Sequence, residues 1–222
     1  MSAILEARGV TRSFGPIKVL HGVDFSLVPG EVHALIGENG AGKSTTMKIL
    51  GGYLSPTDGE LLLDGKPVRF ADQKEAEEAG ILMIHQEFNL AMQLTVEENL
   101  FLGREKRKGL FLDHKAMQDE ARTLLERLDC HIDPRTRIRD LSVPNRQMVE
   151  IARAIGRNAR VLIMDEPTAV LTGRETDVLL DQIERLKSQG AAILYTSHKL
   201  DEIARIADRV TVLRDGAHIT TR

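Results

Sequence analysis

Short apolar segments separated by Gly and Pro occupy the chain as far as about residue 85. ILEARGV and VDFSLVPG have the pattern of strands, and EVHALIG begins a third after the turn dipeptide Pro29-Gly30. ELLLDGKPV is typical of a hairpin with Asp64-Gly65 at its turn. A charged helix near 72–79 leads into ILMIH, which is short and apolar enough for a buried strand. The pattern predicts a strand-rich first part.

Helical spacing of the apolar positions replaces this pattern from about residue 95 to residue 158. Asp113 is expected to cap a helix that starts directly after it. A second helix is expected from about Asn145 to Arg157. The middle of the chain is therefore predicted to be mostly helical.

Strands and helices alternate again after residue 159. VLIMD and AAILYTS are predicted strands around a helix that ends at Gly190, and RVTVLRDGAHITT is a predicted hairpin. We expect an α/β core formed by residues 1–88 and 159–222. A helical subdomain of about residues 89–158 interrupts it.

The composition narrows the class of protein. The 222 residues carry 30 Lys and Arg against 33 Asp and Glu, a formal net charge of −3, which disfavours a nucleic-acid backbone as the main partner. Cys130 is the only cysteine, which excludes an internal disulfide framework and a multi-cysteine metal site, and we expect it to be buried. We interpret the charged stretch REKRKG at 104–109 as a solvated loop.

Neither a secretory signal nor an apolar stretch of about 18 residues is visible in the sequence. We expect an isolated domain of this sequence to be soluble. Work at a membrane would then require attachment to another component.

The segment GENGAGKST, residues 37–45, fits the phosphate-loop pattern G-x-x-x-x-G-K-[ST] between a predicted strand and a predicted helix. Glycines let the backbone wrap closely around phosphates, and N–H groups at a helix N-terminus favour anions. Lys43 can reach the β- and γ-phosphates, and Ser44 can bind Mg²⁺. We expect the other nucleotide-binding positions of this loop to be Gly37, Asn39, Gly40, Ala41, Gly42 and Thr45.

A second signal is VLIMDE, an apolar strand that ends in two carboxylates. Ligands of open α/β sheets bind beyond the carboxyl ends of the strands, where Asp165 would face Mg²⁺. Glu166 would be placed to polarise a water for attack on the γ-phosphate. The two motifs indicate an NTPase. The absence of an Asn-Lys-x-Asp string argues against a GTPase, and Glu166 favours hydrolysis over kinase activity.

The remaining features, in their order along almost the whole chain, resemble the ATP-binding cassette (ABC) ATPases. Gln86 follows ILMIH as the family's Q-loop glutamine does, and LSVPN at 141–145 lies where the LSGGQ signature is expected. PTAVLT resembles the D-loop, and His198 after AAILYTS resembles the switch histidine. Phe14 occupies the position of the aromatic ring that contacts adenine. The resemblance implies a P-loop NTPase fold with a mixed sheet core, an N-terminal antiparallel β subdomain and an inserted α-helical subdomain.

The resemblance also implies a mechanism with ATP and Mg²⁺. Two such domains close head to tail over two ATP molecules, as a homodimer or as tandem halves. The implied catalytic residues are Lys43, Gln86, Glu166 and His198, and the implied metal ligands are Ser44, Gln86 and Asp165. Ser142 would contact the ATP bound by the partner domain.

Within the family, EVHALIGENGAGKST, MIHQEFNLAMQLTVEENLFLGRE and QMVEIARAI resemble the N-terminal half of tandem monosaccharide importers of the ribose, xylose and galactose group. That implies import of a sugar or related polyol, with membrane permease subunits and, indirectly, a periplasmic or extracellular sugar-binding protein as partners and no nucleic acid. It also implies a place at the cytoplasmic face of the cell membrane. The chain would be the first half of a longer protein, because it has one phosphate loop.

Two alternatives stay open on chemistry alone. One is a soluble ABC ATPase of the translation type, and the other is a nucleotide-dependent dimerisation switch with little hydrolysis. The signature LSVPN favours the dimerisation switch, because Pro144 carries no N–H with which to bind the partner's γ-phosphate. For the permease, we expect a partly exposed groove at Phe88, Leu90 and Leu94.

Overall fold

The structure is a computed structural model that describes residues 2–84, 89–157 and 159–222. The described residues divide into two compact units, and each is considered by itself. The first unit comprises Met1–Met83, Ala159–Glu166 and Ile183–Arg222, and the second comprises Ile84–Asn158 and Pro167–Gln182. None of the helices in the described ranges is long and apolar enough to cross a membrane.

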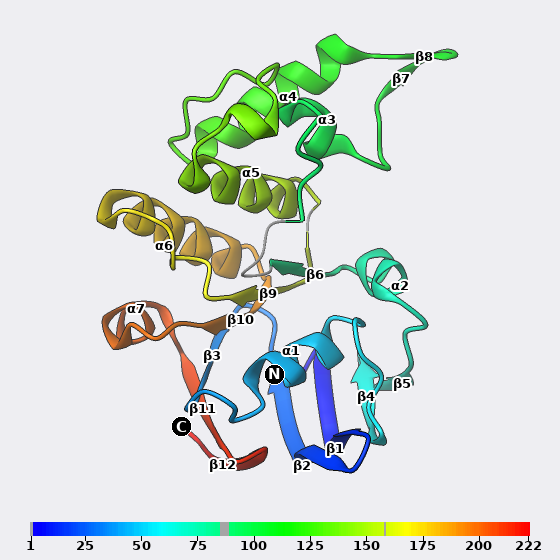
Figure 1. The fold of residues 1–222 in the computed structure, drawn as a ribbon, viewed down its shortest axis with the longest axis vertical. Helices are drawn as coiled ribbons and strands as arrows, with labels where there is room; N and C mark the ends of the chain where they lie inside the picture. Colours follow the sequence, from blue (N-terminus) through cyan, green and yellow to red (C-terminus); the bar gives the residue numbers. More distant parts are fainter. Residues whose placement is uncertain (1, 85–88, 158) are drawn as a thin grey trace. The chain divides into compact units, whose positions relative to one another are not determined.

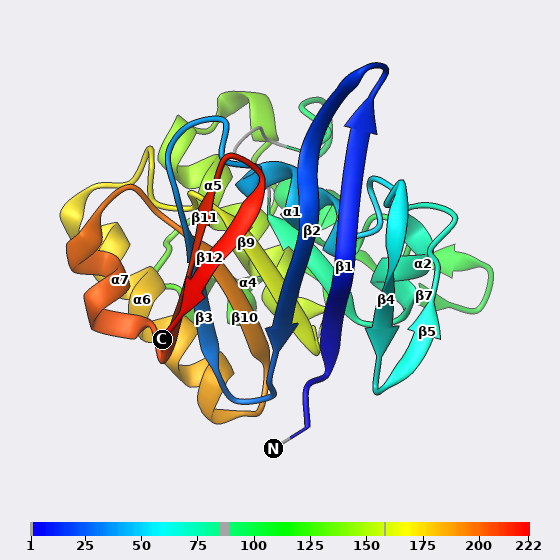
Figure 2. The same cartoon turned by 90° about the horizontal axis from the view of Figure 1, so that it is seen from below.

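An antiparallel sheet of four strands, in the order β2-β1-β4-β5, belongs to the first unit. Its strands are β1 (Leu5–Phe14), β2 (Ile17–Leu27), β4 (Asp58–Leu63) and β5 (Lys66–Val68). Figure 2 shows β1 and β2 as one long hairpin beside β4 and β5. β4 and β5 turn at Asp64-Gly65, which confirms the hairpin expected there.

A six-stranded sheet in the order β12-β11-β3-β10-β9-β6 carries the α/β part of the fold. β10 pairs parallel with both β3 and β9, β11 pairs parallel with β3, and β12 pairs antiparallel with β11. The first four residues of both β3 and β9 are buried, as the continuous apolar runs predict. The bounds are β3 (Val32–Ile36), β6 (Ile81–Ile84), β9 (Val161–Asp165), β10 (Ala192–Thr196), β11 (Arg209–Arg214) and β12 (Ala217–Thr221).

The two sheets of the first unit share one apolar core with helix α1 (Lys43–Leu50). A buried histidine also joins the two sheets. The ring of His33 on β3 stacks on the ring of Phe25 on β2, with centroids 4.3 Å apart. Its Nδ1 lies 2.8 Å from the carbonyl oxygen of Ser26 and its Nε2 lies 2.7 Å from Thr211 Oγ1. Burial lowers the pKa of His33 to about 4, so the ring is neutral at physiological pH.

The other helices are α2 (Gln73–Glu78), α3 (Val96–Phe101), α4 (His114–Arg127), α5 (Val143–Gly156), α6 (Gly173–Ser188) and α7 (Leu200–Ile206), with a 3₁₀ turn at Ile138–Asp140. Asp113 caps α4 by accepting a hydrogen bond from the N–H of Ala116, as expected. The helix predicted from Asn145 begins two residues earlier, because Ser142 is its N-cap and proline is accepted in a first turn.

The second unit contains α3, α4, α5 and the small hairpin of β7 (Arg107–Lys108) and β8 (Phe111–Leu112) (Figure 1). Residues 167–182, expected in the core, group with this unit instead. An ion pair between Arg174 Nη2 on α6 and Asp129 Oδ2 after α4, at 2.7 Å, lies within this unit. Cys130 is buried, as expected, and burial raises the pKa of its thiol to about 11.

Candidate nucleotide site

Three adjacent parallel strands of the first unit end at one edge of the six-stranded sheet. β3, β10 and β9 are neighbours in that order, with Tyr195 opposite Ala34 and Thr196 opposite Asp165. The loop after β3 holds residues 37–42, β9 ends in Asp165, and His198 follows β10. The topology therefore brings the phosphate-loop segment, the paired carboxylates and the histidine to the same edge.

The loop between β3 and α1 depends on glycine. Gly40 and Gly42 have φ values of 85° and 96°, a region that other residues seldom adopt. A Cβ on Gly42 would lie 2.5 Å from Leu20 Cδ2. Ala41 N–H closes the turn on the carbonyl of Glu38 at 3.1 Å. Glycines at positions 40 and 42 therefore suit a backbone conformation that other residues seldom adopt.

Lys43 is the first residue of α1 and folds back over this loop. Its Nζ donates to the carbonyl oxygens of Gly37 at 2.6 Å and Glu38 at 3.0 Å. An ammonium group has three donors, so one remains for a further acceptor. Gly42 supplies no capping side chain, which leaves the first-turn N–H groups of α1 open to an anion. Ser44 is exposed and Thr45 half-buried at this turn.

Thr196, at the end of β10, fixes the two carboxylate positions. Its Oγ1 accepts a hydrogen bond from the N–H of Glu166 at 3.1 Å and donates to Asp165 Oδ1 at 3.0 Å. Thr196 is 1% exposed. A single buried hydroxyl therefore sets both the turn after β9 and the orientation of the first carboxylate. Thr196 cannot be singled out from the sequence, because nothing in AAILYTS distinguishes it from a structural strand residue.

Glu166 is held in an uncommon backbone conformation, with φ of 49°. Such a conformation costs free energy in a residue other than glycine and is frequent at functional sites. Its Oε1 lies 2.6 Å from His198 Nε2, and the Glu166 side chain is 20% exposed. The structure thus joins two residues that the sequence places 32 positions apart, within reach of solvent.

Mg²⁺ prefers oxygen ligands and retains several waters while binding one or two protein groups and substrate phosphates. The carboxylate of Asp165 and the hydroxyl of Ser44 are such donors, one half-buried and one exposed. The donor set of the described residues therefore fits magnesium that arrives with a nucleotide.

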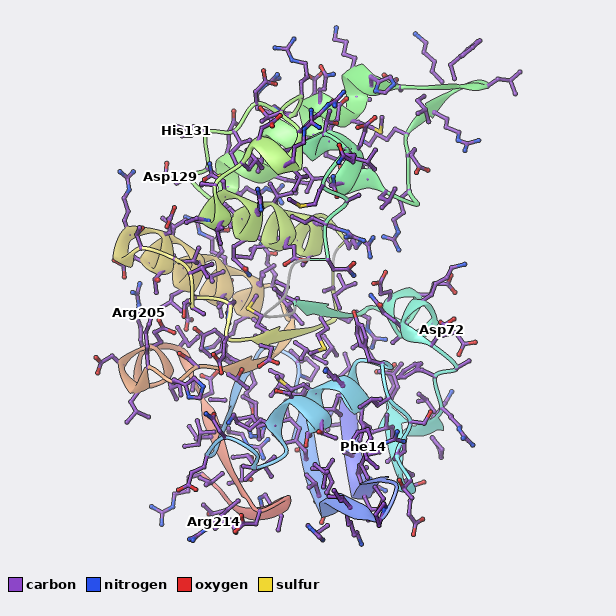
Figure 3. All side chains as sticks on the ribbon, in the orientation of Figure 1. Phe14, Asp72, Asp129, His131, Arg205 and Arg214 are labelled. Carbon is purple, nitrogen blue, oxygen red and sulfur yellow. The ribbon has the colours of Figure 1, made fainter. Side chains whose placement is uncertain are left out.

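Phe14 lies at the end of β1, beside the tip of the β1–β2 hairpin, and is 45% exposed (Figure 3). The guanidinium of Arg12 covers one face of its ring, 4.7 Å from the centroid. The ring is therefore a surface aromatic rather than a core residue.

Ser142 is exposed at the start of α5, in the second unit. Its Oγ accepts a long hydrogen bond of 3.4 Å from the N–H of Asn145. Pro144 has no N–H, and the N–H of Arg146 bonds to the carbonyl of Ser142. Val143 N–H is thus the first-turn donor that these contacts leave open.

Gln86 and Phe88 lie outside the described residues. Of the other two residues of the expected groove, Leu90 is buried at 9% exposure and Leu94 is half-buried.

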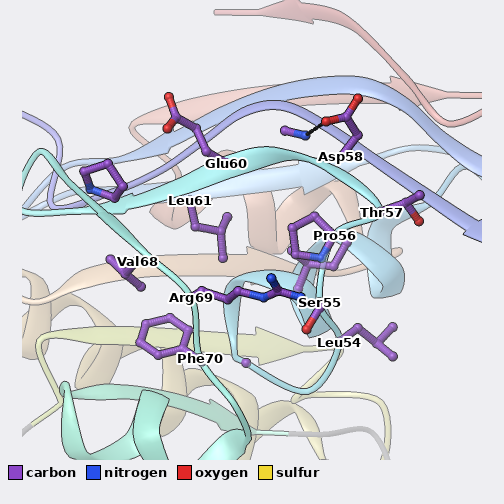
Figure 4. Close-up of a pocket in the computed structure, with 14 residues that line it drawn as sticks. Leu54, Ser55, Pro56, Thr57, Asp58, Glu60, Leu61, Val68, Arg69 and Phe70 are labelled. Atoms are coloured by element: carbon purple, nitrogen blue, oxygen red, sulfur yellow. Dashed lines mark hydrogen bonds between the residues drawn. The ribbon is translucent and has the colours of Figure 1, made fainter.

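A cavity of about 380 Å³ lies in the first unit beside β4 and β5 (Figure 4). Leu61, Val68 and Phe70 line its apolar side, and Thr57, Glu60 and Arg69 lie among its polar lining. No residue from 37 to 45 lines it, so it is separate from the phosphate loop.

The chain is similar to known proteins over most of its length. Residues 20–169 match the family described as ABC transporter. The chain is 55% identical over 216 residues to "Ribose import ATP-binding protein RbsA 1" of Rubrobacter xylanophilus, covering 97% of this chain and 43% of that protein. It is 51% identical over 218 residues to "Putative ribose/galactose/methyl galactoside import ATP-binding protein 1" of Burkholderia ambifaria, covering 98% and 42%. The chain thus spans less than half the length of these relatives.

Two solved structures are similar over nearly the whole chain. A nucleotide-free ATP-binding cassette from an ABC transporter has a TM-score of 0.87 at 26% identity, covering 99% of this chain and 91% of its own. The ADP conformation of another cassette has a TM-score of 0.85 at 27% identity, covering 100% and 91%. These similarities and the sheet order confirm the fold class expected from the sequence.

Proposed function

Because the chain belongs to the ABC transporter family, we propose that it binds ATP with Mg²⁺ and hydrolyses it to drive the import of a sugar or related polyol. The observation that carries the proposal is the edge formed by β3, β10 and β9, where the loop with Lys43 and the Glu166–His198 pair occur together. The names of the relatives support sugar import over a soluble ATPase of the translation type.

ATP binding begins with the loop. The open N–H groups at the start of α1 bind phosphate oxygens, and the third donor of Lys43 reaches the β- and γ-phosphates. Phe14 offers the adenine its ring face opposite Arg12. Gly37, Asn39, Gly40, Ala41, Gly42 and Thr45 complete the cradle.

Bound Mg²⁺ would neutralise charge on the phosphates, held by Ser44, Asp165 and Gln86. Thr196 keeps Asp165 oriented for this role through the bond at 3.0 Å. Gln86 is included in the proposal because its position in the sequence resembles that of the Q-loop glutamine of the ABC ATPases.

Hydrolysis then requires an ordered water and stabilised charge. Glu166 polarises the attacking water with the carboxylate oxygen that His198 does not hold. His198 then binds the γ-phosphate, on which charge accumulates. Because this chemistry consists of positioning and electrostatics, the bond from Thr196 to the backbone of Glu166 contributes to it directly.

The partners proposed are a second ABC ATPase domain, membrane permease subunits and, through them, a sugar-binding protein. The second domain closes head to tail, and Ser142 contacts its ATP. We propose a tandem arrangement with residues 1–222 as one half, which is compatible with the chain covering 43% of the relative's length. The complex works at the cytoplasmic face of the membrane, and no nucleic acid takes part.

The test is ATP-driven uptake of labelled ribose by the full-length protein with its permease in proteoliposomes. Glu166→Gln is expected to remove the hydrolysis contributed by this half and to lower uptake, while ATP binding stays within about twofold. Glu78→Gln, on the exposed side of α2, is the matched control and should transport normally. Uptake that is unchanged in Glu166→Gln would contradict the proposed role of this site.

A second candidate, a switch with little hydrolysis, is favoured by one observation: Pro144 removes a donor from the start of α5. A hydrogen bond to a charged phosphate is worth about 1.5–3 kcal/mol. Pro144→Gly should therefore strengthen ATP-driven association of the two halves by about tenfold or more. If association is unchanged, the missing donor does not weaken this half's contact with the partner's ATP.

A further inference from the structure

The stretch 104–109, which the sequence suggested to be a solvated loop, belongs to a hairpin of residues 104–112 that projects from the second unit (Figure 1). β7 and β8 pair Arg107 with Leu112 and Lys108 with Phe111. The two-residue turn between them starts at Gly109, with φ of 66°, which is the glycine position of a type II′ turn. We call residues 104–112 the basic hairpin.

The tip of the basic hairpin is apolar and exposed. Leu110 is 96% exposed, Phe111 80% and Leu112 44%. Single exposed apolar side chains are common on proteins, but three in succession at a projecting turn are not. Ordering them in water brings no hydrophobic gain, so the tip is suited to an apolar environment outside its own unit.

The strand that leads into the turn, and the residues before it, are cationic. Arg104, Arg107 and Lys108 are exposed, and Lys106 pairs with Glu120. The one acidic residue of the segment, Glu105, accepts a hydrogen bond from the N–H of Gly103 at 3.0 Å, which holds its pKa below the usual range. The segment thus carries four basic residues against one acidic residue, in a chain whose formal net charge is −3.

We propose that the basic hairpin docks on an anionic lipid surface, with Leu110 and Phe111 in the apolar boundary and Arg107 and Lys108 among the headgroups. An anionic bilayer satisfies both features, because it offers negative charge directly above hydrocarbon. The phosphates of a nucleic-acid backbone would pair with the basic side chains but would leave Leu110 and Leu112 exposed to water. The proposal goes beyond the proposed function, and nothing in the nucleotide site depends on it.

The chain has no Trp, which makes a sharp experiment possible. In Phe111→Trp the tryptophan is a unique reporter at the tip. Its emission should shift to the blue with vesicles of equal parts phosphatidylcholine and phosphatidylglycerol, and little with phosphatidylcholine alone. Leu200→Trp, at a position 70% exposed on α7, is the control and should not shift.

Two changes in the Phe111→Trp background separate charge from insertion. Arg107→Gln with Lys108→Gln should weaken partitioning by about fivefold for each charge removed. Leu110→Ser should weaken it by about tenfold. ATP binding measured in parallel should be unchanged in every variant, which shows that the protein is folded and keeps this test apart from that of the ATPase.

Three results would overturn the proposal. They are no shift with the anionic vesicles, an equal shift with neutral vesicles, or tighter binding of the chain to a duplex oligonucleotide than to the vesicles.

Discussion

At the scale of single residues, the buried hydroxyl of Thr196 holds both carboxylate residues of the nucleotide site. Thr196→Val keeps the shape but removes the bonds to Glu166 N–H and Asp165 Oδ1. We expect the free energy of unfolding to fall by about 1–3 kcal/mol, because both partners lose a bond in a largely buried place.

The same variant should lower kcat for ATP more than it raises KM, because Thr196 positions the carboxylates without contributing to the phosphate loop. Urea unfolding and steady-state ATPase assays would measure the two effects. Thr123→Val, on the exposed side of α4, is a control that should change neither. A rise in KM with kcat unchanged would show that Thr196 acts on binding instead.

Glu150 on α5 gives the stability a specific pH dependence. Its side chain is buried and accepts a hydrogen bond from the N–H of Asn89 at 2.6 Å. Desolvation raises its pKa from 4.5 to about 6. The folded state therefore holds this proton more tightly than the unfolded state, and ionisation costs the folded state free energy.

Relative to Glu150→Gln, the wild-type protein should lose about 2 kcal/mol of stability as pH rises from about 4.5 to about 6.5. Below that window the two proteins should be similarly stable, and above it the difference should stay constant. Denaturant unfolding across this pH range measures the difference. A difference that grows toward acid pH would mean that the carboxylate, not the acid, is stabilised by folding.

The residues that sequence could identify are those whose chemistry shows in a local string. Lys43 and Ser44 stand in one motif, and Asp165 and Glu166 in another. Thr196 and the pairing of Glu166 with His198 depend on the alignment of β10 beside β9, which no local pattern carries.

At the scale of elements, two hairpins provide a matched comparison. Gly65 and Gly216 both follow Asp, with φ of 73° and 74°. A Cβ on Gly65 would have no neighbour within 4 Å, whereas on Gly216 it would lie 2.0 Å from the carbonyl oxygen of Val19. Gly216 N–H also bonds to the carbonyl of Ala41 in the phosphate loop, at 3.2 Å.

Gly65→Ala should lower the free energy of unfolding only by the cost of backbone strain, about 1–2 kcal/mol. Gly216→Ala should cost about 1–3 kcal/mol more, from the clash, and should weaken ATP binding because the turn supports the loop. Thermal unfolding and ATP titration would measure both. Equal losses in the two variants would mean that the C-terminal hairpin moves aside freely.

Element types were largely predictable because apolar periodicity and Asp-Gly turns are local signals. The basic hairpin was not, because its charges suggest a loop and its strands, Arg107–Lys108 and Phe111–Leu112, are two residues each. The predicted start of α5, about Asn145, is two residues late, because the capping role of Ser142 and the place of Pro144 in the first turn are seen only in the structure.

At the scale of the whole molecule, bound nucleotide should stabilise the fold by mass action. Mg-ATP at about 100 times its Kd adds about 2.7 kcal/mol to the free energy of unfolding and raises Tm by about 5–10 °C. Lys43→Ala should abolish this rise in Tm, since it removes the ammonium that binds phosphate. Differential scanning fluorimetry with and without Mg-ATP measures the change in Tm. A full shift in Lys43→Ala would place the nucleotide elsewhere.

The division into two units was only partly visible in the sequence. The change from strand to helical periodicity indicated the inserted helices, but residues 167–182 group with them in space, and contacts between distant segments such as Arg174 with Asp129 lie within that unit. Such contacts join segments 45 positions apart and leave no trace in local periodicity.

The buried imidazole between the two sheets of the first unit has a spectroscopic consequence. The carbonyl of Ser26 can only accept, so His33 carries its proton on Nδ1, and its unprotonated Nε2 accepts a hydrogen bond from the hydroxyl of Thr211. Thr221 must then donate to Thr211, at 2.7 Å, and His218 to Thr221, at 2.8 Å. Because the His33 ring is 1% exposed, we expect its Nδ1 proton to exchange slowly with water and to give an NMR resonance that is lost when the two sheets separate.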